Sequence, residues 1–211
     1  MFKRLVGLLT VAVTGLFLSG VASADITSSA HDLGTVLSIP ETQICIVCHS
    51  PHENQNAEGN LLWNHDPTVQ TFTPYTSPTL DGGPSVGPGP TSTLCLGCHD
   101  GTIAVDSYGG ATGTNFMGAG IFSATAAFGP DLSNDHPVGI TYDDVADTEL
   151  NPTTTPVTFG VGSGTVADML QAGMIECASC HDVHNSISEG NTTLLNVDNT
   201  GSGLCLACHN K

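Results

Sequence analysis

The sequence predicts a mostly irregular fold with short helices and few short strands, made of two repeated units. Three observations predict it. The chain contains 25 Gly and 12 Pro among 211 residues, which favours turns over long regular elements. Apolar residues make up 39% and aromatic residues 5% of the chain, a thin supply for a core of side chains alone. All eight Cys fall in four copies of one short motif, so we expect this motif to organise the interior.

The first 24 residues have the form of a secretory signal peptide. Lys3 and Arg4 precede an apolar run over 5–18, and the small residues Ala22 and Ala24 suit cleavage after Ala24. The run is shorter than the roughly 20 residues that a membrane span needs. We therefore expect cleavage, no span in the remaining chain, and a secreted protein at the cell surface or outside the cell, with the periplasm as the alternative.

The repeated motif is C-x-x-C-H, which is the attachment signature of c-type haem. Its two Cys can form thioethers with the haem vinyl groups, and the His that follows is placed to bind the iron. Disulfides, a zinc site or a thioredoxin-like pair would not require that His. We predict four covalent haems and a haem-dominated fold, a tetrahaem cytochrome c of two dihaem repeats. The attachment residues are Cys45, Cys48, Cys95, Cys98, Cys177, Cys180, Cys205 and Cys208, and the proximal iron ligands are His49, His99, His181 and His209.

An internal repeat selects the distal iron ligands among the five remaining histidines. The segment H-x-x-G occurs at His31 and at His136, and C-x-x-C-H-x-x-H ends at His52 and at His184. His65 has Val197 as its counterpart, so we predict that it is not a ligand. Axial methionines are the other common choice, but the four repeated histidines suffice for four low-potential irons. The predicted distal ligands are His31, His52, His136 and His184.

Chain order predicts which haem each distal His serves. His31 and His136 precede the first haem of their own units and can fold back on it. His184 follows His181 by three residues, too close to reach the far face of the same iron, so we expect it at the second haem of the first unit. By the same repeat, His52 would serve the last haem of another subunit.

The rest of the chain is expected to connect these sites. After the signal peptide, 1–24, we divide it into a first dihaem unit with a Gly/Ala-rich connector, 25–130, and a second dihaem unit, 131–211. Short helices are expected at each motif. The other expected elements are an irregular loop over 73–90, short strands or haem-packing segments at 121–122 and 126–128, a weak strand over 151–164, and a helix over 166–171 that places Met169 in the core.

These motifs resemble those of the doubled C-x-x-C-H multihaem cytochromes. The segments that carry the resemblance are C-x-x-C-H-S-P-H, L-L-W-N-H-D, L-C-L-G-C-H-D-G-T, H-P-V-G, C-x-S-C-H-D-V-H and L-C-L-x-C-H, between residues 31 and 209. The four-haem size and the signal peptide resemble the OmcE-type tetrahaem cytochromes, which polymerise into extracellular conducting filaments. The resemblance implies little regular structure and a distal His donated to a haem of the next subunit.

The charge balance limits the function and the partners. The net charge is −17, and the only bases are Lys3, Arg4 and Lys211. Nucleic acids and anionic membrane surfaces are bound through Lys and Arg, so we expect neither as a partner. The haem propionates would likewise lack cationic side chains, which makes Ca²⁺ a candidate counter-ion.

The leading hypothesis is an electron conduit at the cell surface or outside the cell. Its expected partners are other redox proteins or an extracellular electron acceptor, and further copies of the chain in head-to-tail contacts. The alternatives are a diffusible periplasmic electron shuttle and a multihaem redox enzyme. An enzyme needs an iron with an open position, whereas the spare histidines outnumber the irons, so we expect an electron carrier and no catalytic residues.

Overall fold

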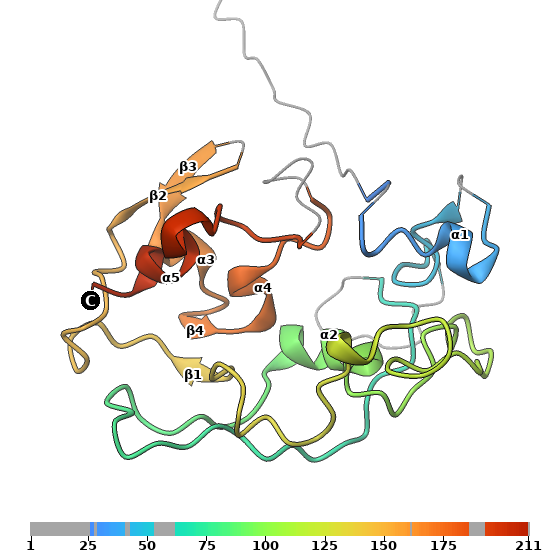
Figure 1. Ribbon diagram of the computed structural model, residues 1–211, viewed down its shortest axis with the longest axis horizontal. Helices are drawn as coiled ribbons and strands as arrows, with labels where there is room; N and C mark the ends of the chain where they lie inside the picture. The colour runs from blue at the N-terminus through green and yellow to red at the C-terminus, as the bar shows by residue number, and fades with distance from the viewer. Residues whose placement is uncertain are drawn as a thin grey trace, which may run out of the picture.

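The computed structural model describes residues 26–27, 29–40, 43–52, 62–160, 162–185 and 193–210. The predicted signal peptide, 1–24, lies outside them. Most of the described chain is coil and turn, as the sequence predicts (Figure 1). Its elements are α1 (Gly34–Leu37), α2 (Pro90–His99), η3 (Ala124–Ala126), β1 (Ile140–Thr141), β2 (Pro156–Phe159), β3 (Gly162–Thr165), α3 (Val166–Met169), β4 (Met174–Ile175), α4 (Cys177–Cys180), η4 (Thr200–Ser202) and α5 (Gly203–Cys208).

Helices carry three of the four motifs. The second motif ends α2, the third lies in and just after α4, and the fourth does the same with α5. The first motif is formed by turns instead. α2 starts with Pro90 at its first position, where the missing N–H costs no helical hydrogen bond. The irregular loop predicted over 73–90 therefore ends at Gly89.

The described strands form two small antiparallel pairs. β2 and β3 make a hairpin in which Pro156 lies opposite Thr165 and Phe159 opposite Gly162. This hairpin confirms the weak strand signal over 151–164. β1 pairs with β4, with Ile140 opposite Ile175. The sequence analysis did not predict this second pair, because two-residue strands leave no periodic pattern.

A small hydrophobic cluster lies in the second unit. Met169 is buried in it, as predicted, although α3 ends there and not at 171. α3 begins with a capping box between Thr165 and Asp168. Tyr142 is the polar edge of the cluster, because its hydroxyl donates to the carbonyl oxygens of Asn151 and Cys208 at 2.7 and 3.0 Å. The buried members are Ile140, Tyr142, Val157, Val166, Met169, Ile175 and Val197.

The connector differs from the prediction of short strands at 121–122 and 126–128. Turns and η3 occupy this stretch, and Gly118 and Gly120 adopt positive φ values of 81° and 63°, which interrupt extended pairing. The alternative prediction was that these segments pack on a haem, and Phe128 lies near one of the predicted iron ligands. The ring of Phe128 lies 5.8 Å from that of His99, between centroids.

Figure 1 shows α2 between α1 on one side and the elements of the second unit on the other. α2 contacts α4 directly, so the second and third motifs meet where the two units join. Within the described ranges, no helix has the length and apolar character that crossing a membrane requires.

Candidate functional site

The first and third motifs are held by the same backbone arrangement. After each motif the chain returns alongside it, and the aligned residues Asn64 and Asn196 each donate a backbone N–H to the second cysteine of the motif at 2.9 Å. The side-chain amide of Asn64 also donates to the Ile46 carbonyl at 2.5 Å, and that of Asn196 to the Ala178 carbonyl at 3.0 Å. The repeated Asn therefore fixes the loop that presents the proximal His.

Six of the eight predicted iron-binding histidines form three ring pairs, and each pair joins a proximal His to a distal one. The pairs are His49 with His184 at 5.9 Å and 23° between ring planes, His31 with His99 at 6.0 Å and 44°, and His136 with His209 at 6.4 Å and 68°.

This spacing fits an iron between the two rings. If a metal–imidazole bond is about 2 Å and a ring centre lies about 1 Å beyond its nitrogen, two rings on opposite sides of one metal have centres about 6 Å apart. All three separations lie close to that value. The distances between these rings are therefore compatible with the predicted roles of their histidines, which remain a prediction.

The hydrogen bonds of the rings also fit metal binding. The Nδ1 atom faces a carbonyl oxygen in His99 (Ala126, 2.7 Å), in His136 (Pro137, 3.1 Å) and in His181 (Thr193, 3.2 Å). A ligating His commonly donates its second ring N–H to such an acceptor, which fixes the tautomer and aims the other nitrogen at the metal. Nε2 is therefore the atom available to iron in these three rings.

The pairing differs from the one expected from chain order. His31 lies against His99 and not His49, and His136 lies against His209 and not His181. His184 lies against His49, the first motif, and not the second. After His31 the chain runs through α1, which ends at Ser38 with a φ of 56°.

His52 and His181 are the two predicted ligands outside these pairs in the described chain. His52 is a predicted distal ligand and His181 a predicted proximal ligand, so together they would make a fourth pair of the same kind. Both are exposed. The hydroxyl of Ser50 donates to the backbone carbonyl of His52.

His65 has a different environment from every predicted ligand. Its side chain is fully buried, with 0% exposure. Nδ1 lies 2.8 Å from the Asp66 carbonyl oxygen, Nε2 lies 2.9 Å from that of Ala104, and the sulfur of Cys98 is 3.4 Å from Nε2. Both nitrogens are thus engaged inside the fold, which supports the structural role that the repeat predicts.

The cysteines show that the motifs follow one another in space as they do in sequence. Burial first, and then the nearby Cys48 thiol, raises the pKa of Cys98. Cys95 and Cys177 share a thiol hydrogen bond, which raises the pKa of Cys95 and lowers the pKa of Cys177 to about 7. In the second unit, burial and then Cys208 raise the pKa of Cys180 to about 11. Each motif therefore lies beside the next one.

All eight cysteines lie outside disulfide bonds. Among the residues that the structure describes, no group of three or more His, Cys, Asp or Glu side chains could hold a metal ion by itself. The expectation of Ca²⁺ at the haem propionates remains a prediction.

Two residues at the junction of the units were missed by the sequence analysis. Ser92 and Glu176 are buried, with 0% and 3% exposure, and the Ser92 hydroxyl donates to the Glu176 carboxylate. One signal was present in the sequence. Glu176 is the only acidic residue directly before a C-x-x-C-H motif, since the other three motifs follow Ile or Leu.

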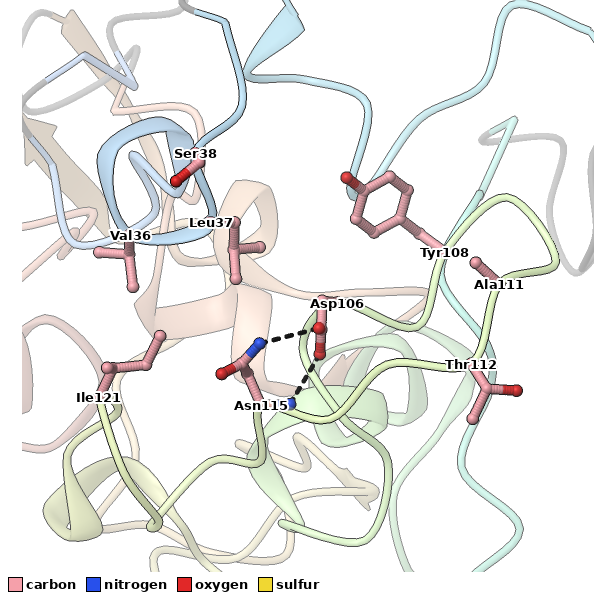
Figure 2. A pocket seen from close by; sticks show the side chains of 9 residues that line it. All are labelled: Val36, Leu37, Ser38, Asp106, Tyr108, Ala111, Thr112, Asn115 and Ile121. Carbon is pink, nitrogen blue, oxygen red and sulfur yellow. Dashed lines mark hydrogen bonds between the residues drawn. The ribbon is translucent and has the colours of Figure 1, made fainter.

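A surface hollow of about 560 Å³ lies between α1 and the connector (Figure 2). At its centre, Asp106 accepts hydrogen bonds from the backbone of Thr114 and from the backbone and amide of Asn115. Although partial burial opposes it, these bonds lower the pKa of Asp106. None of the predicted haem-binding residues lines this hollow. Its lining is Val36, Leu37, Ser38, Asp106, Tyr108, Ala111, Thr112, Asn115 and Ile121.

Comparison with known families gives one match. The model of the doubled CXXCH motif matches residues 170–211, which contain the third and fourth motifs. No curated protein matches the chain. The match supports a multihaem c-type cytochrome that takes part in electron transfer, and its motifs indicate covalently bound c-type haem. Proteins with this paired motif are generally electron carriers.

Proposed function

We propose that the chain is a tetrahaem electron carrier that conducts electrons along a row of bis-His haems at the cell surface or outside the cell. The observation that carries the proposal is the set of three proximal–distal His pairs at 5.9, 6.0 and 6.4 Å. When bound, the haems would supply one-electron ferric–ferrous chemistry. The protein would attach them through its cysteines, bind both axial positions of each iron, and so leave no position for a substrate.

The order of the motifs supports a row. The cysteines of each motif lie beside those of the next, and the largest gap in sequence, between the second and third motifs, is closed by the contact of α2 with α4. Four attachment sites in so small a chain hold their groups close together. This closeness allows electrons to move without a binding pocket.

The fourth axial pair is proposed to form between subunits, from His181 and His52. Within one chain, the second unit gives His184 to the first motif of the first unit. Repeating that step would bring the next unit's equivalent residue, His52, to His181. That next unit belongs to another copy of the chain. Both side chains are exposed, as such a contact requires.

The sequence predicted that His52 serves the haem of the fourth motif, at His209, in another subunit. The proposal assigns it instead to the haem of the third motif, at His181. The head-to-tail arrangement of subunits is unchanged. Two different surfaces meet in such a contact, so it propagates into a filament unless it closes into a ring. The OmcE-type resemblance of the sequence motifs is consistent with this assembly.

The decisive variant is His52→Ala in the full, haem-loaded chain. We expect loss of filaments in electron micrographs of the secreted fraction, together with one high-spin iron per chain in resonance spectra. A wild-type protein that stays monomeric with all irons low-spin would contradict the filament, because His52 would then serve His181 within its own chain. A high-spin iron in intact wild-type protein would contradict the electron carrier itself and favour the enzyme.

A further inference from the structure

A buried carboxylate lies where the two units meet. Glu176 is 3% exposed, and its oxygens accept the backbone N–H of Gly89 at 3.1 and 3.2 Å and the hydroxyl of Ser92. It is also the N-cap of α4, where its backbone carbonyl accepts the N–H of Ser179 at 2.9 Å. The Gly89 N–H and the Ser92 hydroxyl both donate to the side chain, which suits a carboxylate because that group only accepts hydrogen bonds.

The N-terminal end of α2 lies against this carboxylate in place of a cationic side chain. Gly89 is the N-cap of α2, and Glu176 is itself the N-cap of α4. Unpaired N–H groups at helix starts favour a negative charge there. The fit is close, since a Cβ atom on Gly89 would collide with the carboxylate. Position 89, directly before α2, therefore requires a residue without a side chain.

Ser92 connects the second motif to the third. Its hydroxyl donates to Glu176 and accepts the backbone N–H of Cys177 at 2.9 Å. Ser92 lies on α2, one turn before Cys95, and Cys177 is the first cysteine of the third motif. The side chains of Cys95 and Cys177 lie next to each other. One side chain thus fixes the place where the attachment sites of the two units touch.

The repeat shows that this contact is specific to the junction inside the chain. The fourth motif has Ser202 at the position of Ser92, and Ser202 is exposed and makes no capping bond. The first motif has Ile44 at the position of Glu176, and Ile44 is half-buried. The fourth motif therefore carries the serine, and the first motif lacks the carboxylate.

We propose that Ser92 and Glu176 are positioning residues for electron transfer between the two units. Their contact holds the second and third haem-attachment sites side by side, and the carboxylate places a negative charge at this junction. That charge stabilises the oxidised state of the two nearest haems over the outer two. This inference rests on the proposed electron-carrier function.

The test is redox potentiometry of the haem-loaded full chain with Glu176→Gln, which removes the charge and keeps the shape. Two of the four midpoint potentials should rise while the other two stay, with the low-spin spectrum unchanged. Ser92→Ala is the second variant, in case Glu176→Gln does not accumulate, and should move the same two potentials. Ser202→Ala is the matched control and should move none.

Unchanged potentials in both variants, or equal shifts of all four, would overturn the inference. A merely structural role would lower stability without confining the shift to two haems. Failure of the proposed function would look different, since it would appear as a high-spin iron in the wild-type chain before any substitution.

Discussion

The two C-x-x-C-H-x-x-H segments, at 45–52 and 177–184, share a backbone but differ in what packs behind it. In both, an Asn of the returning chain clasps the motif, and the residue two positions before it, Leu62 or Leu194, adopts a positive φ of 50° or 54°. One position after the Asn the units diverge. The first has His65, with hydrogen bonds to two carbonyl oxygens, and the second has Val197, in the hydrophobic cluster.

The difference shows that one haem-attachment loop can be supported in two ways. The second unit supports it with apolar contacts from β2 and α3, which the first unit lacks. At the position of Val197 the first unit places the polar ring of His65, which is buried in that unit together with Asp100 and Ser107. A buried polar ring is stable only while its hydrogen bonds are made, so at this position the first unit depends on specific bonds and the second on contact area.

The largest expected effect is on the iron that each unit's distal His serves. His184→Ala should convert one low-spin haem to high-spin, and the converted haem should be the one at Cys45–His49, in the other unit. Adding Cys45→Ser and Cys48→Ser would remove that haem. The triple variant should then show no high-spin iron in resonance spectra.

The control for this cross-unit pairing is His136→Ala, which should open the haem at His209 in its own unit. Removal of the first haem should leave that high-spin signal in place. If the triple variant with His184→Ala still shows a high-spin iron, the pairing of His184 with His49 is wrong. The pairing predicted from chain order, in which His184 serves the haem of the second motif, would then be favoured.

The next effect concerns His65. His65→Val, which copies the second unit, removes the contacts of the ring nitrogens with the carbonyl oxygens of Asp66 and Ala104, and should lower the free energy of unfolding by about 1–3 kcal/mol. The low-spin spectrum should not change, since His65 is not a predicted ligand. Denaturant titrations followed by the haem absorbance measure the first result, and resonance spectra measure the second.

The reciprocal substitution, Val197→His, tests the comparison from the other side. It places a polar ring in an apolar cluster without the carbonyl partners of the first unit, and should cost about 1–3 kcal/mol of stability. Equal stability of either variant with the wild type would show that the two supports are interchangeable. A new high-spin iron in His65→Val would instead make His65 a ligand.

A smaller effect, of similar size in both units, is expected at Asn64 and its repeat counterpart Asn196. Asn64→Ala and Asn196→Ala each remove side-chain bonds to the motif backbone, so each should lower the free energy of unfolding by about 1–2 kcal/mol. Thermal unfolding by circular dichroism measures both. Because the arrangement is the same, the two losses should agree, and a large difference would show that the loops are not equivalent.

The smallest effect lies in the connector, which the second unit lacks. Hydrogen bonds hold the pKa of Asp106 below its ordinary value, although its partial burial opposes the shift. The stability it adds is thus present above an unfolded pKa of about 3.9 and is lost as the pH falls through the folded value. Asp106→Asn should cost under about 1 kcal/mol at neutral pH, because the carboxylate is well solvated. The difference in the free energy of unfolding between the variant and the wild type should vanish at acidic pH. A difference that does not change with pH would show that it does not come from the charge of Asp106.

The sequence by itself determined the four C-x-x-C-H motifs and the general character of the fold. C-x-x-C-H is a local signal, complete within five residues, so no tertiary information is needed to recognise it. The scarcity of regular structure follows from the Gly and Pro content, and the hairpin of β2 and β3 from an alternation of Thr, Val and Phe. Internal repetition ranked His65 below the other distal histidines, and its buried contacts support that ranking.

Only the tertiary structure decided which histidines face each other and what joins the units. His49 and His184 meet across 135 positions of the printed sequence, and Ser92 and Glu176 across 84. Chain order predicted a different pairing because it counted the distance along the chain and not the direction in which each turn sends it. Contacts of this kind depend on how whole segments pack in three dimensions. The residues next to each of them in the sequence do not indicate which distant residue it will contact.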